Sequence, residues 1–430
     1  MVIDRPAYLS QLKKKRNNGY IKIITGIRRC GKSFLLFELY HHYLNSIGIS
    51  DDCIIELKLD QAANARYRNP LELDHYLKER LRDTNKQYYV FLDEIQMVKE
   101  IPNQYLEHET IGFVDVLLGL KEIPNADIYV TGSNSKMLSS DIVTQFRDRG
   151  DVVQLFPLSF KEFLTAYHGE REHAWRDYYT YGGLPRILEL ETHKEKADYL
   201  TGLFEKTYIT DIMERNGIRN DKTVLDILLN IVSSSIGSLT SYTKLANTFL
   251  GVGKVKVSVS TISNYLDFFR DAFLLNKADR YDIKGKKYME SPCKWYYTDL
   301  GLRNARLNFR QLEQTHIMEN ILYNELLVRG FSVDVGLVEV REKDAQTDKV
   351  VRSQLEVDFV ANSGNVTSYI QSAFSIEGEG KKEKEIHSFL KINDSFKKVV
   401  IVRDNITPWY DDNGILFIGL EEFLLSDQLY

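Results

Sequence analysis

The sequence predicts an α/β protein that begins with a parallel sheet covered by helices on both faces. Over the first 165 residues, short apolar runs alternate with amphipathic segments of helical period. Runs such as YYVFL (88–92) are apolar at every position, which is typical of strands buried on both faces of a parallel sheet. The chain of 430 residues is too long for one core, so we expect further domains.

The elements of this first region follow one another in a regular order. Alternation of strand and helix is the pattern of a parallel sheet, in which each helix returns the chain to the same edge. Strands are expected at 20–26, 53–60, 88–95, 126–135 and 151–158, and helices at 32–43, 71–81 and 114–123.

Composition narrows the class of protein. An apolar fraction of 43% and a charged fraction of 27% are those of an ordinary globular protein. No stretch reaches 18 uninterrupted apolar residues, so we expect no membrane span, and the first residues lack the apolar core of a secretion signal. Cys30, Cys53 and Cys293 are too few and too far apart for a disulfide framework or a metal site, which favours a cytoplasmic location.

The clearest motif is GIRRCGKS (26–33), which matches the phosphate-binding loop G-x-x-x-x-G-K-[ST] between a predicted strand and a predicted helix. Backbone N–H groups of such a loop surround the β-phosphate of ATP. Lys32 is expected to reach the β- and γ-phosphates and Ser33 to bind Mg²⁺. The predicted nucleotide-binding residues of this segment are Gly26, Ile27, Arg28, Arg29, Cys30, Gly31, Lys32, Ser33 and Phe34.

Three of these residues are unusual in a phosphate loop. Arg28 and Arg29 are expected to contact phosphate oxygens, acidic groups near the site or a neighbouring subunit. Cys30 is interpreted as a small residue that fits the loop. The alternative is a redox-sensitive thiol that blocks the pocket when it is oxidised.

An acidic pair follows the third predicted strand in YYVFLDEI (88–95). Asp93, at the carboxyl end of a buried strand, is predicted to hold Mg²⁺ through water, and Glu94 to be the base that polarises the attacking water. One further strand, 53–60, lies between this strand and the first. The order therefore favours the P-loop proteins that hydrolyse ATP with a catalytic glutamate over small GTPases and simple kinases.

Other candidate catalytic residues come from the end of the fourth strand and the loop that follows. That strand is predicted to lie between the first and the third, so Asn134 is expected to bond the γ-phosphate and the lytic water, with Ser133 as the second choice. Arg147 and Arg149 are candidates for an arginine finger that a homo-oligomer presents to a neighbour's nucleotide. The alternative is a turn at Asn134 and a solvated loop at the arginines.

The motif YGGLP (181–185) opens the helical segment that follows. Gly182, Gly183 and Pro185 would suit a lid hinge over the adenine, so Pro185 is included among the candidate nucleotide-binding residues. A plain turn between two helices is an equally good interpretation.

A basic segment lies in the middle of the chain. Residues 240–310 hold 13 Lys and Arg against 6 Asp and Glu, although the whole chain has a net charge of −5. Residues 241–249 and 258–275 have the pattern of a helix–turn–helix, and 278–299 that of a β-hairpin that turns at Lys284, Lys286 and Lys287. A recognition helix with a basic wing is a recurrent DNA-binding arrangement, so we expect DNA as a partner. The alternative is a winged helix that binds protein or packs on its neighbours.

In the C-terminal segment, Glu325 lies on a predicted helix and Glu356 and Asp358 on a predicted strand. This arrangement resembles the PD-(D/E)-x-K nuclease core, in which carboxylates bind Mg²⁺ and a lysine activates water. Gln371 matches the second acid, but Ala373 stands where the lysine belongs. We therefore expect a degenerate core used for binding or assembly, without strong cleavage activity.

Taken together, GIRRCGKS, VFLDEI, TGSNSKMLSS, FPLSFKEFL, YGGLP and EVDFV…YIQ resemble one prokaryotic family of AAA-type ATPases over nearly the whole chain. That family has a C-terminal domain of unknown function related to restriction endonucleases. The resemblance implies a P-loop AAA-type domain (1–165), a helical lid (166–235), a winged-helix-like domain (236–311) and a nuclease-like α/β domain (312–430).

These expectations combine into two functional hypotheses. The first is a Mg²⁺-dependent ATPase that couples ATP hydrolysis to the binding or remodelling of DNA, including branched DNA, as an oligomer. The second is a nucleotide-gated switch or scaffold for a protein partner, in which hydrolysis only resets the switch.

Overall fold

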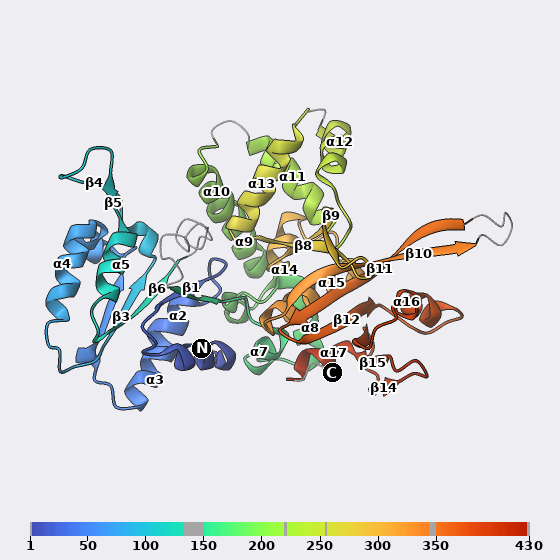
Figure 1. Cartoon of the computed structure of the whole chain (residues 1–430), viewed down its shortest axis with the longest axis horizontal. Helices are drawn as coiled ribbons and strands as arrows, with labels where there is room; N and C mark the ends of the chain where they lie inside the picture. Colours follow the sequence, from blue (N-terminus) through green and yellow to red (C-terminus); the bar gives the residue numbers. More distant parts are fainter. Residues whose placement is uncertain (1, 133–149, 219–221, 254–255, 344–349, 428–430) are drawn as a thin grey trace. The chain divides into compact units, whose positions relative to one another are not determined.

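Figure 1 shows the computed structural model of the chain, which describes residues 2–132, 150–218, 222–253, 256–343 and 350–427. The chain divides into two compact units. The first comprises the residues up to Pro157 together with Asp271–Phe273, and the second comprises Leu158–Arg270 and the residues from Leu274 onward. Among the helices in these ranges, none is both long enough and apolar enough to cross a lipid bilayer.

The first unit contains the predicted parallel sheet. Its order is β2-β3-β6-β1-β7, and every neighbouring pair is parallel. β6 lies between β1 and β3, as the sequence predicts for the strand that ends in the TGSNS motif. The strands are β1 (Ile21–Thr25), β2 (Ile54–Lys58), β3 (Tyr88–Asp93), β6 (Ala126–Thr131) and β7 (Gly150–Gln154).

Helices alternate with β1, β2, β3 and β6 along the chain. The segment predicted as one helix over 32–43 is helical throughout but contains a π-helical turn at Leu35–Tyr40 between α2 and α3. A small hairpin of β4 (Ile101–Pro102) and β5 (Thr110–Ile111) was not predicted, because strands of two residues have no detectable period. The helices are α1 (Pro6–Lys15), α2 (Lys32–Phe34), α3 (His41–Ser46), α4 (Pro70–Arg80) and α5 (Phe113–Lys121).

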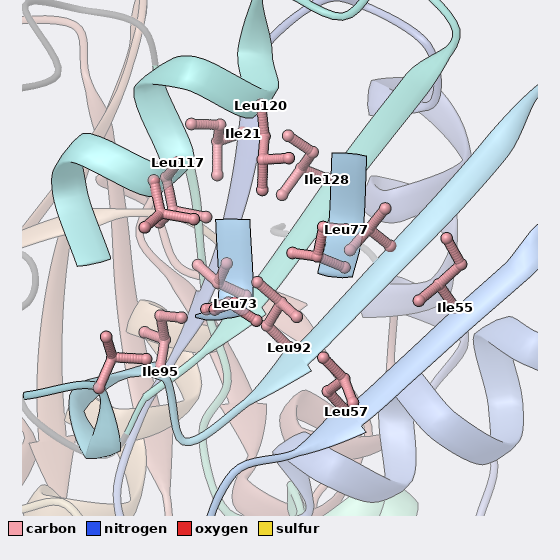
Figure 2. Close-up of a cluster of buried hydrophobic side chains, with 14 of the residues drawn as sticks. Ile21, Ile55, Leu57, Leu73, Leu77, Leu92, Ile95, Leu117, Leu120 and Ile128 are labelled. Carbon is pink, nitrogen blue, oxygen red and sulfur yellow. The ribbon is translucent and has the colours of Figure 1, made fainter. Parts of the chain in front are cut away.

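One face of the sheet packs against α4 and α5. Figure 2 shows Leu73 and Leu77 of α4 together with side chains from the strands, and Leu117 and Leu120 of α5 belong to the same cluster. Leu92 of β3 also lies in this cluster and is fully buried. Burying a leucine side chain contributes about 1.5–3 kcal/mol, so each of these leucines stabilises the packing of the helices on the sheet.

The opposite face of the sheet carries a buried charged network. Lys22 of β1 is fully buried and forms an ion pair with Asp127 of β6. The Tyr129 hydroxyl donates to Asp127 at 2.7 Å, and Tyr40 shares a hydrogen bond of 2.6 Å with Tyr129. Burial lowers the pKa of Lys22, although Asp127 opposes the shift. The strand YIKIITG thus includes a charge because a partner on the neighbouring strand compensates it.

The second unit combines helices with one mixed sheet. The sheet order is β14-β15-β13-β12-β11-β10-β8-β9. Its strands are β8 (Leu275–Asp282), β9 (Lys287–Tyr297), β10 (Ser332–Lys343), β11 (Val350–Ser363), β12 (Val366–Ala373), β13 (Lys397–Val402), β14 (Trp409–Tyr410) and β15 (Leu416–Gly419). Its helices are α7 (Phe160–Thr165), α8 (Arg171–Tyr181), α9 (His193–Leu203), α10 (Thr210–Arg215), α11 (Lys222–Ser234), α12 (Tyr242–Gly253), α13 (Val259–Asp271), α14 (Leu300–Arg306), α15 (Gln314–Val328), α16 (Lys381–Leu390) and α17 (Leu420–Leu425).

The predicted hairpin exists but is part of the larger sheet. β8 and β9 pair antiparallel around a turn at 283–286, as expected for a wing. β8 also pairs in parallel with β10, at Arg280 with Val335 and Asp282 with Leu337. The boundary expected near residue 311 therefore does not divide the sheet, because hydrogen bonds between β8 and β10 join the two sides.

The YGGLP loop of the second unit surrounds the buried carboxylate of Asp299. The Gly183 N–H donates to Asp299 Oδ2 at 2.8 Å, and the Leu302 N–H donates to Oδ1 at 3.1 Å. Gly182 has a φ of 77°, and a Cβ there would lie 2.3 Å from Asp299 Oδ1. A Cβ on Gly183 would lie 2.3 Å from the Leu158 carbonyl oxygen. These close contacts explain both glycines and favour the interhelical turn over a hinge. Burial raises the pKa of Asp299 to about 6, although the backbone N–H groups oppose the shift.

This raised pKa predicts a pH-dependent term in stability. The unfolded carboxyl ionises near pH 4 and the folded one near pH 6, so the stabilisation is complete below about pH 4 and is lost as the pH rises to about 6. The loss corresponds to about 3 kcal/mol. We expect the difference in free energy of unfolding between the wild type and Asp299→Asn to fall by this amount between pH 4 and pH 7.

Urea titrations followed by tryptophan fluorescence measure this difference, because Trp175, Trp295 and Trp409 all belong to the second unit. A difference that stays constant over this pH range would show that Asp299 does not change its protonation on folding.

Candidate nucleotide-binding site

The loop Gly26–Ser33 leaves the carboxyl end of β1 and begins α2, and its shape depends on unusual backbone angles. Gly26, Arg29 and Gly31 have φ values of 139°, 66° and 101°. A Cβ on Gly26 would lie 2.0 Å from the carbonyl oxygen of Leu155. Only glycine fits such an approach, so the first residue of the motif is required by the neighbouring chain as well as by its own conformation.

The back of the loop is held by buried contacts. Cys30 is fully buried and its thiol lies 3.5 Å from the Leu155 carbonyl oxygen. The Arg5 guanidinium donates to the carbonyl of Cys30 at 3.3 Å and to that of Phe156 at 2.8 Å. Burial raises the pKa of the Cys30 thiol, which disfavours the reactive thiolate. These observations favour the interpretation of Cys30 as a residue that fits the loop over that of a redox switch.

Lys32 lies over the loop and is almost fully buried. Its ammonium donates to the carbonyl oxygens of Gly26 and Ile27, both at 3.0 Å. The positive charge therefore lies within the loop, where an anionic phosphate group would compete with these two carbonyls for its hydrogen bonds.

One helix and two strands bring hydroxyl and carboxylate oxygens together beside Lys32. The Ser33 hydroxyl donates to Asp93 Oδ1 at 3.0 Å, and the Thr131 hydroxyl donates to the same carboxylate oxygen. The three residues belong to α2, β3 and β6, and they meet because parallel strands end at one edge of the sheet. A hydroxyl and a carboxylate suit the preference of Mg²⁺ for oxygen, so Ser33 and Asp93 fit the predicted metal-binding role.

Glu94 follows directly and leaves the strand with a left-handed backbone, φ 53°. Its N–H donates to the Thr131 hydroxyl at 3.1 Å, and its carboxylate accepts a hydrogen bond from the Gln96 amide. Thr131 therefore accepts from the backbone of one acid and donates to the carboxylate of the other. The two acids are held in a defined orientation at the carboxyl edge of β3.

The other predicted site residues differ in their placement. Ile27 is fully buried, Arg28 and Phe34 are half-buried, and Arg29 is exposed. The fourth strand ends at Thr131, and the candidates after it, Ser133, Asn134, Arg147 and Arg149, lie outside the described residues. Pro185 belongs to the second compact unit and begins a 3₁₀ turn after the YGGLP loop.

Sequence reasoning missed three residues of this site. Thr131 lies within the TGSNS motif, but the site residues predicted from this motif are Asn134 and Ser133, which follow it. Gln96 follows the acidic pair by two positions, and Arg5 belongs to a segment with no motif. Of the three, only Thr131 could have been predicted from the sequence, because it is a polar residue at the end of a buried strand.

Two solved structures to which this chain is similar have TM-scores below 0.5. A Walker-type ATPase of Pyrococcus abyssi has a TM-score of 0.46 and 15% identity, covering 71% of this chain and 96% of that one. The Orc1 protein of Aeropyrum pernix, solved in complex with DNA, has a TM-score of 0.32 and 12% identity, covering 72% of this chain and 93% of that one.

Family models and relatives are more informative. Residues 18–164 match a model described as an AAA domain, and residues 172–313 match a domain of unknown function (DUF8612). An uncharacterized protein of Methanocaldococcus jannaschii is 29% identical over 437 residues, covering 98% of this chain and 88% of that protein. An uncharacterized protein of Haemophilus influenzae is 31% identical over 433 residues, covering 99% of both chains. The chain therefore belongs to the family of the Haemophilus influenzae protein, and the phosphate loop with its acidic partners lies in its AAA domain.

Proposed function

We propose that the protein is a Mg²⁺-dependent ATPase that couples ATP hydrolysis to the binding or remodelling of DNA. The single observation that carries the ATPase part is the contact of Ser33 with Asp93 beside the loop that holds Lys32. This arrangement joins a cation for the phosphates, oxygen ligands for a metal ion and, at Glu94, a candidate base.

The residues of the loop have distinct roles in this proposal. The backbone N–H groups of the glycine loop surround the β-phosphate, and Lys32 exchanges its bonds to the Gly26 and Ile27 carbonyls for the β- and γ-phosphates. Bound Mg²⁺ would neutralise charge that develops on the phosphate oxygens. Ser33 and Asp93 would hold the ion, and Glu94 would accept the proton of the attacking water.

Further contacts remain proposals from the sequence. Asn134 would bond the γ-phosphate, and Arg147 or Arg149 would reach the nucleotide of a neighbouring subunit in a homo-oligomer. Pro185 would flank the adenine. The contacts of the YGGLP loop with Asp299 favour a structural turn for that motif, so Pro185 is the weakest of these assignments.

The DNA part of the proposal rests on the turn of the β8–β9 hairpin. Lys284, Lys286 and Lys287 are all exposed there, at the end of a hairpin that follows the helix pair α12 and α13. Three other cations of the segment, Arg280, Lys294 and Arg303, are buried with partners in the second unit and do not contribute to a DNA-binding surface. The basic surface is therefore smaller than the sequence count indicates.

The rate of ATP hydrolysis in the presence of DNA tests the whole proposal. We expect duplex, single-stranded or junction DNA at low salt to raise the rate, with the oligomeric state recorded in the same samples. If none of these three kinds of DNA changes the rate, the DNA part of the proposal is wrong. The nucleotide-gated switch for a protein partner is then favoured.

Substitutions in the loop and at the acidic pair test the ATPase part. Lys32→Ala is expected to weaken ATP binding at least about tenfold, because it removes the cation that faces the phosphates. Glu94→Gln is expected to keep ATP binding and to lower turnover by about 100-fold or more, because it removes the base. Calorimetry measures binding and phosphate release measures turnover. Turnover retained in Glu94→Gln would show that another group is the base.

Thr131 provides a test that follows from the geometry. Thr131→Val keeps the volume but removes the hydroxyl that orients Asp93 and the Glu94 backbone, so we expect kcat to fall by about tenfold, or 1.4 kcal/mol. Thr131→Ser retains the hydroxyl and is the matched control, with an expected rate near that of the wild type. Equal losses in both variants would indicate a packing role for Thr131.

The hairpin lysines are tested by a change of charge. Replacing Lys284, Lys286 and Lys287 with alanine is expected to weaken DNA binding and to reduce the slope of log K against log salt by about 3. The control replaces Lys194, Lys381 and Lys384, three exposed lysines of the same unit. DNA titrations at several salt concentrations measure the affinity and the salt slope of each variant. If the two triple variants lose affinity equally, the hairpin has no specific role.

A further inference from the structure

A buried lysine lies among three carboxylates in the second unit. The Lys294 ammonium of β9 is 2.8 Å from Glu319 Oε1 on α15, 2.7 Å from Glu356 Oε1 and 3.8 Å from Asp358 Oδ1, both on β11. Its side chain is only 3% exposed. We call these four residues the carboxylate cluster. They belong to the part of the chain that resembles a nuclease, and the proposed ATPase does not use them.

The structure corrects the prediction for this region. Glu325, the predicted helix acid, forms an ion pair of 2.8 Å with Arg329 instead. Glu319 lies six positions earlier on α15, and six residues rotate a helix by about 240°, so the two acids face different directions. Ala373, at the expected lysine position, is buried in the apolar cluster behind the sheet. Instead of a lysine at position 373, Lys294 of β9 contributes the cation.

Each carboxylate of the cluster already has partners from the protein. Glu319 Oε1 also accepts from the Tyr296 hydroxyl at 2.6 Å, and Asp358 Oδ2 accepts from the Ser372 N–H at 2.8 Å. Burial raises the pKa of Asp358, and Glu319 adds to the shift while Lys294 opposes it. Burial alone would lower the pKa of Lys294, but the three carboxylates outweigh it and raise the pKa, so the ammonium stays charged.

The residues present do not fit a divalent metal ion. Mg²⁺ requires nearly octahedral oxygen ligands at about 2.0–2.1 Å, and most of its ligands are usually water or phosphate. Here the carboxylate oxygens converge on an ammonium that is 3% exposed, and only the Glu356 side chain, 35% exposed, is open to solvent among the three acids. Among the residues that the structure describes, no group of three or more His, Cys, Asp or Glu side chains is arranged to hold a metal ion.

We propose that the Lys294 ammonium is the permanent cation of the carboxylate cluster and replaces the metal ion of a nuclease site. The single charge of the ammonium is shared among acids from α15 and β11. Lys294 therefore connects the β8–β9 hairpin to α15 and to β11. In this proposal the cluster stabilises the second unit, does not cleave phosphodiesters and requires no metal ion.

Binding of Mn²⁺ to the full-length, nucleotide-free protein tests this proposal. We expect wild type and Glu356→Gln to bind Mn²⁺ equally weakly, since the cluster contributes no metal site. Lys294→Met removes the charge and keeps the length of the side chain. We expect it to lower the melting temperature, to bind Mn²⁺ at least about tenfold more tightly than the wild type, and to regain about 5 °C when Mn²⁺ is added.

Two further variants serve as controls. Lys294→Met combined with Asp358→Asn should lose the Mn²⁺ response, because one of the ligands is gone. Lys277→Met removes a lysine of β8 that pairs with Asp279, and should gain no Mn²⁺ response.

The outcomes separate two roles for Lys294. Mn²⁺ binding in the wild type that Glu356→Gln abolishes, or metal-dependent cutting of DNA that Asp358→Asn abolishes, would overturn the proposal and make Lys294 the lysine of an active nuclease. A folded Lys294→Met that gains no Mn²⁺ site would also overturn it. If Lys294→Met does not fold, the comparison of wild type with Glu356→Gln decides by itself. None of these measurements depends on the ATPase, so the proposed function stands or fails separately.

Discussion

The hydrogen bond between Ser33 and Asp93 depends on one constraint, the parallel pairing of β1, β6 and β3. Because the three strands run in the same direction, the phosphate loop, Thr131 and the acidic pair all lie at the edge where these strands end. The apolar face shown in Figure 2 keeps the strands in register, since Leu92 and Ile128 pack under the same helices. A shift of one residue in β3 would turn Asp93 to the other face and separate it from Ser33.

Both units contain lysines that are buried and compensated by carboxylates. Lys22 pairs with Asp127 across two parallel strands, and Lys294 pairs with acids from a helix and a strand. Removing one partner from such a pair typically costs about 3–5 kcal/mol, because the other charge remains buried. Positive residues in this sequence are thus divided between the surface and internal ion pairs, and a count of lysines and arginines does not distinguish the two.

The pairing of β8 with β10 restricts the movement of the basic β8–β9 hairpin. A free wing could move independently, but this hairpin is one edge of an eight-stranded sheet, and Lys294 attaches it to α15. Lys284, Lys286 and Lys287 therefore extend from an element held at two places within the second unit. Such a hairpin would lose less conformational entropy than a free wing when its charges bind a partner, and the proposed contact with DNA would benefit from this.

The sequence by itself determined the strands of the first sheet, the phosphate loop and the acidic pair, because each depends on local period or on residues adjacent in the chain. It also located the β8–β9 hairpin, since its turn and flanking strands are contiguous. The roles of Thr131, of Asp299 in the YGGLP loop and of Lys294 were decided only by the tertiary structure. Their partners are tens of residues away, and periodicity specifies the face of a strand or helix but not which distant side chain meets that face.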